Sequence, residues 1–336
     1  MRGIEKSFGA IHANRNVTLE VASGTIHGIV GENGAGKSTL MSILYGFHEA
    51  DAGEILIGGR RTEIRTPRDA IAAGIGMVHQ HFMLVETLSV VENVMLGAED
   101  AFVLRGGRAR ARAELERLSH DFGLSVHPDA IVGDLPVGEL QRVEILKALY
   151  RQARILILDE PTGVLTPVET DQLFRILRLL REQGVTILLI THKLREIMEV
   201  TDSVSVMRGG EKVADRLTAA TSREELAELM VGRKVRLELE RTPARPRESV
   251  LAVRDLVVSD VLGVRRVDGV SFDLRGGEVV GIAGVSGNGQ SELLETLAGI
   301  RPVSAGEIVV AGRRVDHAMP CDPAAMRRLG LAHVPE

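Results

Sequence analysis

Nine residues from Gly31 to Thr39, GENGAGKST, constrain this chain more than any other stretch. They fit the pattern G-x-x-x-x-G-K-[ST], in which glycines let successive backbone N–H groups curl around phosphate oxygens at the start of a helix. The apolar run 25–30 precedes the loop and the amphipathic stretch 39–46 follows it. A plain tight turn is the alternative, and this strand-and-helix context disfavours it. The residues expected at the phosphates are Gly31, Glu32, Asn33, Gly34, Ala35, Gly36, Lys37, Ser38 and Thr39.

Within this loop, Lys37 is expected to reach the β- and γ-phosphates, and the Ser38 hydroxyl to bind Mg²⁺. The buried-strand run 154–160, RILILDE, ends in two carboxylates. We expect Asp159 to hold Mg²⁺ and Glu160 to act as the base that orients water. The alternative is a strand that ends in a solvated acidic turn. His192 ends another strand-like run, 185–192, where it contacts a γ-phosphate or is merely structural.

The chain repeats itself. Aligning Gly31 with Gly284 sets an offset of 253 residues, and the same offset carries 53–61, GEILIGGRR, onto 306–314, GEIVVAGRR. The second loop, GVSGNGQSE, has Gln290 where a phosphate-binding loop needs a lysine. A neutral amide offers one hydrogen bond in place of a charge, so we expect weak nucleotide binding and little hydrolysis there. The residues kept from the loop pattern are Gly284, Gly287, Gly289 and Ser291.

The repeat sets the expected domains: a first copy at 1–232, a mixed-charge linker at 233–249, and a second copy at 250–336. The second copy matches about the first third of the first, so we expect the chain to be a piece of a longer protein. Both copies are expected to open with strands and a glycine-rich turn into a helix. A helix-rich part at about 85–152 and alternating strands and helices over 154–200 predict an α/β fold with a parallel sheet.

Composition excludes several classes of protein. Aromatic residues make up 3% of the chain, tryptophan is absent and the net charge is −5, so we expect no nucleic-acid partner. A single cysteine, Cys321, leaves no disulfide within the chain and fits a reducing compartment. Apolar runs are of strand length, so a role at a membrane has to go through a partner.

Segment 134–151, DLPVGELQRVEILKALYR, resembles the signature of ATP-binding cassette (ABC) ATPases, L-S-G-G-Q followed by Q-R. Gln80, the LDEPT run and the Thr-His pair complete the ordered set of motifs. Segment 77–97 resembles the ATP-binding subunits of simple-sugar and nucleoside importers, the nucleoside branch above all, which carry two cassettes with a defective second phosphate loop. The resemblance covers the whole first copy and the available part of the second.

The resemblance implies a P-loop NTPase of the ABC type, with a parallel-sheet core, an antiparallel β subdomain and a helical subdomain, duplicated with an incomplete second copy. It implies ATP hydrolysis, with ATP and Mg²⁺ as cofactors, that energises import of a nucleoside or simple sugar. The implied partners are transmembrane permease subunits and, indirectly, an extracellular or periplasmic solute-binding protein. The implied location is peripheral, on the cytoplasmic side of the cell membrane.

The resemblance also implies residue roles. Phe8 corresponds to the aromatic residue that stacks on adenine, an ordinary core phenylalanine being the alternative. Gln80 corresponds to the loop glutamine that contacts Mg²⁺ and water, and the segment after it to the surface that receives the permease. His192 corresponds to the switch histidine. The signature residues expected at nucleotide are Val137, Gly138 and Glu139.

The chain departs from the family pattern where Pro136 replaces the usual serine, where Glu139 replaces the usual glutamine, and at Thr166, where many cassettes have aspartate. Because cassettes of this family meet head to tail, the Gln290 loop would face the Pro136 signature. We therefore expect one hydrolytic site and one site that only binds or regulates.

Two soluble alternatives fit less well. A tandem cassette ATPase acting on ribosomes predicts a long basic linker, and a DNA-repair ATPase predicts zinc cysteines or a coiled coil. A nucleotide-binding regulatory module without turnover stays open, although Glu160 disfavours it.

Overall fold

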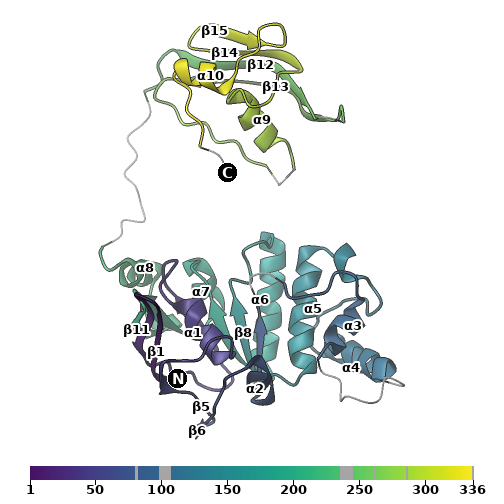
Figure 1. Cartoon of the computed structure of the whole chain (residues 1–336), viewed down its shortest axis with the longest axis vertical. Helices are drawn as coiled ribbons and strands as arrows, with labels where there is room; N and C mark the ends of the chain where they lie inside the picture. Colours follow the sequence, from purple (N-terminus) through teal and green to yellow (C-terminus); the bar gives the residue numbers. More distant parts are fainter. Residues whose placement is uncertain (80–81, 98–106, 235–244, 261, 285–286, 335–336) are drawn as a thin grey trace. The chain divides into compact units, whose positions relative to one another are not determined.

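The computed structural model describes residues 1–79, 82–97, 107–234, 245–260, 262–284 and 287–334. The chain folds as two compact units, Met1–Leu237 (unit 1) and Glu238–Glu336 (unit 2) (Figure 1). The boundary between the units falls inside segment 233–249. In the described residues, no helix is both long and apolar enough to cross a membrane.

Unit 1 is built on a six-stranded sheet with the strand order β11-β10-β3-β9-β8-β7. All neighbours are parallel except β10 and β11. The strands β3 and β9 are buried along their whole length, as expected for parallel strands that are covered on both faces. The sheet comprises β3 (Ile26–Val30), β7 (Ile75–Val78), β8 (Ile155–Asp159), β9 (Thr186–Ile190), β10 (Ser203–Arg208) and β11 (Glu211–Leu217).

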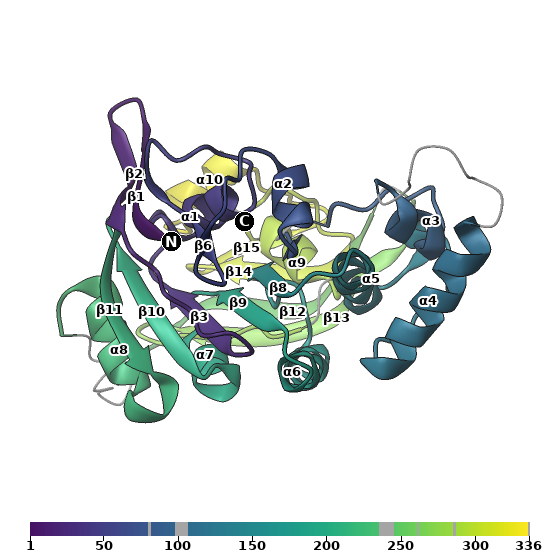
Figure 2. The ribbon, with the colours of Figure 1, turned by 90° about the horizontal axis from the view of Figure 1, so that it is seen from below.

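Helices cover both faces of this sheet because successive strand residues point to opposite sides. Leu188 of β9 packs in the cluster of α1 (Lys37–Leu44), whereas Leu189 packs in the cluster of α6 (Pro167–Glu182). Helices α6, α7 and α8 lie along one face, and α1 lies on the other (Figure 2). The bounds of the elements that follow α6 are α7 (Leu194–Val200), η2 (Thr218–Ala220) and α8 (Arg223–Val231).

An antiparallel sheet of order β2-β1-β4 lies beside α1. A two-stranded sheet, β5-β6, follows it along the chain. The two sheets comprise β1 (Arg2–Phe8), β2 (Ile11–Val17), β4 (Ala52–Glu54), β5 (Leu56–Ile57) and β6 (Arg60–Arg61). The helix α2 (Pro67–Ala72) follows β6 along the chain. The antiparallel β subdomain expected from the family resemblance is therefore confirmed.

The segment expected to be helix-rich carries α3 (Val90–Met95), α4 (Gly107–Asp121), η1 (Val132–Asp134) and α5 (Val137–Tyr150). The Ser89 hydroxyl and the Glu92 carboxylate form a capping box at the start of α3. Val91, Leu115 and Val143 from the three α-helices are fully buried in one cluster. This agrees with the expected helical subdomain.

Unit 2 contains the sheet β13-β12-β14-β15 and two helices. Its backbone repeats that of unit 1 at the offset found in the sequence: φ is 93° at Gly36 and 90° at Gly289, and 100° at Gly53 and 81° at Gly306. The elements are β12 (Ser249–Ser259), β13 (Arg265–Arg275), α9 (Gln290–Leu297), β14 (Ala305–Val310), β15 (Arg313–Asp316) and α10 (Pro323–Arg328).

Unit 2 opens with strands and a glycine-rich turn into α9, as expected, but residues 278–284, directly before the second loop, form no strand. Their counterpart in unit 1, β3, is held between β9 and β10. In the described part of unit 2 no strand flanks residues 278–284 in this way. Val279 is accordingly 96% exposed.

Candidate functional site

The first glycine-rich loop connects the end of β3 to the start of α1. Gly34 and Gly36 have φ values of 81° and 93°, which only glycine adopts without strain. A Cβ at Gly36 would lie 2.2 Å from the Ala13 carbonyl oxygen. Buried Asn14 donates from Nδ2 to the Gly36 carbonyl at 3.1 Å, which fixes the loop from outside the motif. Nothing in the sequence pattern singles out Asn14.

Lys37 is 5% exposed, and its Nζ donates to the carbonyl oxygens of Gly31 and Glu32 at 2.8 and 2.9 Å. Burial lowers the pKa of Lys37, and the charges of Glu160 and Asp159 oppose that shift. The loop thus holds a buried cation at the start of α1, where its field is screened less than in water. That is the requirement for attracting a triphosphate.

Ser38 and Asp159 come from different elements and meet at the carboxyl edge of the parallel sheet. The Ser38 Oγ donates to Asp159 Oδ1 at 3.4 Å. Burial raises the pKa of Asp159, while the Ser38 hydrogen bond lowers it. A hydroxyl and a carboxylate are ligands that Mg²⁺ accepts, with phosphates and waters completing its shell. Among the described residues, no cluster of three or more acidic, histidine or cysteine side chains that could hold a metal is found.

Glu160 and His192 are also brought together. The Nδ1 atom of His192 lies 2.9 Å from Glu160 Oε1. Glu160 has a φ of 48°, a left-handed conformation that side chains rarely adopt. Its amide donates to the Ile190 carbonyl of β9 at 2.9 Å. The neighbouring strands therefore hold this strained turn, and strain of this kind gathers at functional sites.

Glu196 of α7 connects the two segments that carry Glu160 and His192, and sequence reasoning missed it. Its carboxylate accepts hydrogen bonds from Thr162 Oγ1 at 2.5 Å and from Thr191 Oγ1 at 3.0 Å. It is 6% exposed. The stretch 193–200 reads as an ordinary amphipathic helix, so no pattern in the sequence indicates that this carboxylate points inward.

The signature segment forms the start of α5. Pro136 is the N-cap residue and supplies no side-chain cap. A Cβ at Gly138 would lie 2.6 Å from Glu169 Oε1, so this glycine allows close approach of α5 to α6. Thr166 caps α6 and forms a capping box with Glu169. Aspartate and threonine are both good N-cap residues, so the departure at Thr166 keeps the cap of α6.

Phe8 lies at the end of β1 and is 44% exposed, so it is not a core side chain. The His48 ring packs edge-on against it at 5.2 Å, and Lys6 Nζ lies 5.6 Å from its centroid. Stacking on adenine stays a prediction. Gln80, expected to bind Mg²⁺ and water, lies outside the described residues.

The second loop keeps the backbone shape of the first. Gly287 and Gly289 have φ values of 87° and 90°, and a Cβ at Gly289 would lie 2.2 Å from the Arg266 carbonyl oxygen. Gln290 and Ser291 open α9 as Lys37 and Ser38 open α1. The Gln290 amide packs against Gly284.

A hollow of about 290 Å³ lies between α5 and the segment that follows β7. On its lining, Phe47 is 44% exposed and Met83 59% exposed. Buried Glu144 accepts from the Met83 amide at 2.7 Å, and Lys147 donates to the Met83 carbonyl at 2.7 Å. Burial raises the pKa of Glu144. These bonds fix the segment and leave its apolar side chains on the surface, and we call this hollow the Met83 groove.

Comparisons with known proteins identify the family. A family model described as ABC transporter matches residues 14–163 and 267–336, one stretch in each unit. The match takes in well over half of the chain, so this chain belongs to the ABC transporter family and carries its ATP-binding domain. The two stretches agree with the internal repeat.

Curated relatives are import ATP-binding proteins. A glucose import ATP-binding protein of Haloferax volcanii is 46% identical over 364 residues, covering 100% of this chain and 66% of the relative. The nucleoside import ATP-binding protein NupA of Lactococcus lactis is 44% identical over 336 residues, covering 100% and 66%. The guanosine import ATP-binding protein NupO of Bacillus subtilis is 46% identical over 336 residues, covering 100% and 65%. The chain thus spans just under two thirds of the length of these relatives.

Solved structures show the same fold. The ADP conformation of an ATP-binding cassette of an ABC transporter has a TM-score of 0.61 at 25% identity, covering 69% of this chain and 97% of that chain. A nucleotide-free cassette has a TM-score of 0.59 at 24% identity, covering 69% and 93%.

Proposed function

We propose that this chain is the ATP-binding and ATP-hydrolysing subunit of an importer for a nucleoside or simple sugar. One observation carries the proposal: a buried lysine, a hydroxyl, two carboxylates and a histidine meet at one edge of the parallel sheet of unit 1. This is the arrangement that phosphoryl transfer from a nucleotide requires.

In this proposal the residues divide the work. Lys37 and the loop amides bind the β- and γ-phosphates, and Ser38 with Asp159 would hold Mg²⁺. The metal would neutralise charge on the phosphates when bound. Glu160 orients the attacking water and accepts its proton, and His192 Nδ1 fixes the Glu160 carboxylate at 2.9 Å. Val137, Gly138 and Glu139 would contact nucleotide held by a facing cassette.

The two loops have unequal roles in the proposal. Gln290 keeps the loop shape but carries no charge, so the site in unit 2 binds nucleotide weakly and hydrolyses little of it. Pro136 removes a hydroxyl from the signature that would face that loop. ATP hydrolysis at the Lys37 site then drives import.

The Met83 groove is the proposed contact with transmembrane permease subunits. Its exposed Phe47, Met83 and Leu96 supply apolar area, and Glu144 and Lys147 hold the segment rigid. In the same proposal the chain is peripheral on the cytoplasmic side of the cell membrane, and an extracellular or periplasmic solute-binding protein delivers the solute to the permease. The solute class follows from the names of the relatives.

The test of turnover is MgATP hydrolysis by the chain and by its Glu160→Gln variant. We expect Glu160→Gln to bind ATP as the parent does and to lose hydrolysis by at least ~100-fold, because proton transfer of this kind contributes 10²–10⁴-fold. Glu182→Gln, on the exposed side of α6, is the matched control. Equal hydrolysis by Glu160→Gln and the control would refute the assignment of Glu160.

The test of transport is uptake of labelled guanosine, ribose and glucose by cells whose own copy of this subunit is replaced with each variant. If cells carrying Glu160→Gln lose uptake of one of these solutes, the result supports a role in import. Full ATP hydrolysis with uptake of every solute unaffected would contradict the importer and favour a soluble ATPase.

A further inference from the structure

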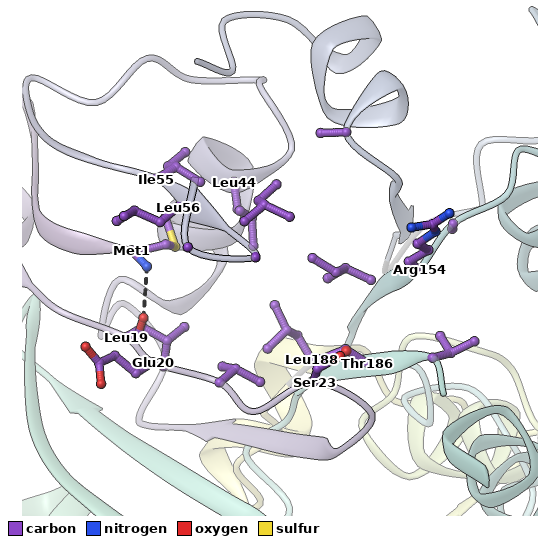
Figure 3. Close-up of a pocket in the computed structure, with 18 of the residues that line it drawn as sticks. Met1, Leu19, Glu20, Ser23, Leu44, Ile55, Leu56, Arg154, Thr186 and Leu188 are labelled. Carbon is purple, nitrogen blue, oxygen red and sulfur yellow. Dashed lines mark hydrogen bonds between the residues drawn. The ribbon is translucent and has the colours of Figure 1, made fainter. Parts of the chain in front are cut away.

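Glu160 and His192 lie at the edge of the parallel sheet where β8 and β9 finish. At the opposite ends of these strands, Arg154 and Thr186 line a hollow of about 810 Å³ (Figure 3). That hollow is a strand's length away from Glu160, so the contacts that hold the turn after β8 lie elsewhere. They come from α5 and α7.

The turn after β8 needs such contacts because its backbone is strained at Glu160. The φ of Glu160 is 48°, and Pro161 follows directly. A residue before proline is ordinarily extended, so this φ persists only where neighbouring groups hold the turn. One such contact is the hydrogen bond from the Glu160 amide to the Ile190 carbonyl of β9.

Gln141 of α5 supplies a second contact to this turn, and the mechanism proposed above does not use it. Its Nε2 donates to the Pro161 carbonyl oxygen at 2.8 Å. Gln141 is 3% exposed, and a buried amide costs free energy unless it is hydrogen-bonded. The bond therefore joins the first turns of the signature helix to the residue that follows Glu160.

Thr162, the next residue of the turn, connects it to the segment that carries His192. Its hydroxyl donates to one carboxylate oxygen of Glu196, and the Thr191 hydroxyl donates to the other at 3.0 Å. On the other side of His192, Lys193 Nζ donates to the Thr162 carbonyl at 3.0 Å. The two threonines and Glu196 are buried, so these bonds are stronger than they would be in water.

We propose that Gln141 is a positioning residue for ATP hydrolysis. Its bond to the Pro161 carbonyl fixes the turn that carries Glu160, and the contacts of Glu196 extend this restraint to His192. The inference rests on the proposed roles of Glu160 and His192. Loss of the bond leaves the phosphate loop at the start of α1 as it is, so the effect falls on kcat and not on nucleotide binding.

The test compares Gln141→Met with Gln172→Met in the full chain. Methionine keeps the length of the side chain but cannot donate a hydrogen bond. Gln172 of α6 is the matched control because it accepts from Arg142 of α5 at 2.8 Å, so it joins the same two helices without contacting the turn. We expect Gln141→Met to lower kcat for MgATP about fivefold, the effect of one hydrogen bond, with KM unchanged. An equal loss in Gln172→Met, or a change in KM alone, would overturn the proposal.

A double variant tests whether Gln141 and Glu196 act along one path. Two residues that hold the same turn are not independent, so Gln141→Met combined with Glu196→Gln should lose little more kcat than the more damaging single change. Full multiplication of the two single losses would overturn the shared path. Gln172→Met combined with Glu196→Gln is the control, and there each change should have its separate effect.

Hydrogen exchange tests the restraint without turnover. The Glu160 amide donates to Ile190, and the Lys193 amide donates to Thr191 Oγ1 at 3.0 Å. In Gln141→Met we expect both amides to exchange about fivefold faster, and in Gln172→Met neither. Unchanged exchange at both amides, or faster exchange at Glu160 without Lys193, would overturn the proposal. Undiminished hydrolysis by Glu160→Gln would instead contradict the proposed function, and the exchange rates distinguish the two failures.

Discussion

His27 makes the stability of unit 1 depend on pH in a way that the structure quantifies. It lies on β3, is 3% exposed, and its Nδ1 and Nε2 lie 2.7 and 2.8 Å from the hydroxyls of Ser203 and Ser205. Burial lowers the pKa of His27 to about 4 from an ordinary 6.5; Asp215 opposes this shift and Lys212 reinforces it. The folded state therefore keeps the imidazole neutral.

The sign follows from the order of the two pKa values. Since the unfolded chain binds the proton first, the contribution of His27 to stability is complete above pH 6.5 and is lost as pH falls toward 4. Between pH 7.5 and pH 4.5 the loss comes to about 2.5 kcal/mol for this group alone. Below about pH 3 the contribution of His27 no longer changes, and further losses come from other groups.

The assay is urea unfolding followed by tyrosine fluorescence. Both tyrosines of the chain, Tyr45 and Tyr150, belong to unit 1, and tryptophan is absent, so the signal reports unit 1. His27→Gln is the matched variant, because its amide can still hydrogen-bond the serine hydroxyls but does not titrate. As the pH is lowered from 7.5 to 4.5, we expect the free energy of unfolding of the parent to fall by about 2.5 kcal/mol more than that of the variant. A difference that stays constant across this range would refute the buried neutral histidine.

The remaining predictions concern the two loops and their support. Gly36→Ala should abolish nucleotide binding in a filter assay, because the new Cβ meets the Ala13 carbonyl oxygen. Gly34→Ala has no atom within 4 Å of its new Cβ, so backbone strain alone should weaken binding by no more than ~10-fold. Equal losses of binding in the two variants would contradict the packing argument. Glu196→Gln should lower kcat with little change in KM for MgATP, because it loosens the segments that carry Glu160 and His192, and a pure KM effect would contradict that role. Gln290→Lys should add a second tight nucleotide in equilibrium dialysis; an unchanged stoichiometry would mean that the missing charge is not what weakens the second loop.

Much of the site could be predicted from the sequence because its residues follow directly from strand ends and one glycine-rich turn. Asp159 ends β8, Glu160 follows it, and His192 follows β9 after Thr191, so parallel pairing brings these residues to one edge of the sheet. The parallel sheet and the helical region follow from local periodicity in the sequence, whereas the antiparallel sheet is expected only from the family resemblance.

What the sequence could not predict depends on contacts between distant segments. Asn14 and Glu196 are ordinary polar residues in amphipathic stretches, and their roles come from carbonyl and hydroxyl groups elsewhere in the chain. The missing strand before the second loop has the same origin. Its sequence matches β3, but a strand needs neighbours, and the described part of unit 2 supplies none beside it.

The Lys37 loop is the proposed working nucleotide site. The most direct test is binding of a fluorescent ATP analogue with Mg²⁺ to the chain and to Lys37→Ala, with the exposed Arg175→Ala as control. A partly buried charge near a phosphate is worth up to ~4 kcal/mol, so we expect Lys37→Ala to weaken binding at least ~100-fold and Arg175→Ala to leave it unchanged. Unchanged affinity in Lys37→Ala would show that the Lys37 loop is not the working nucleotide site.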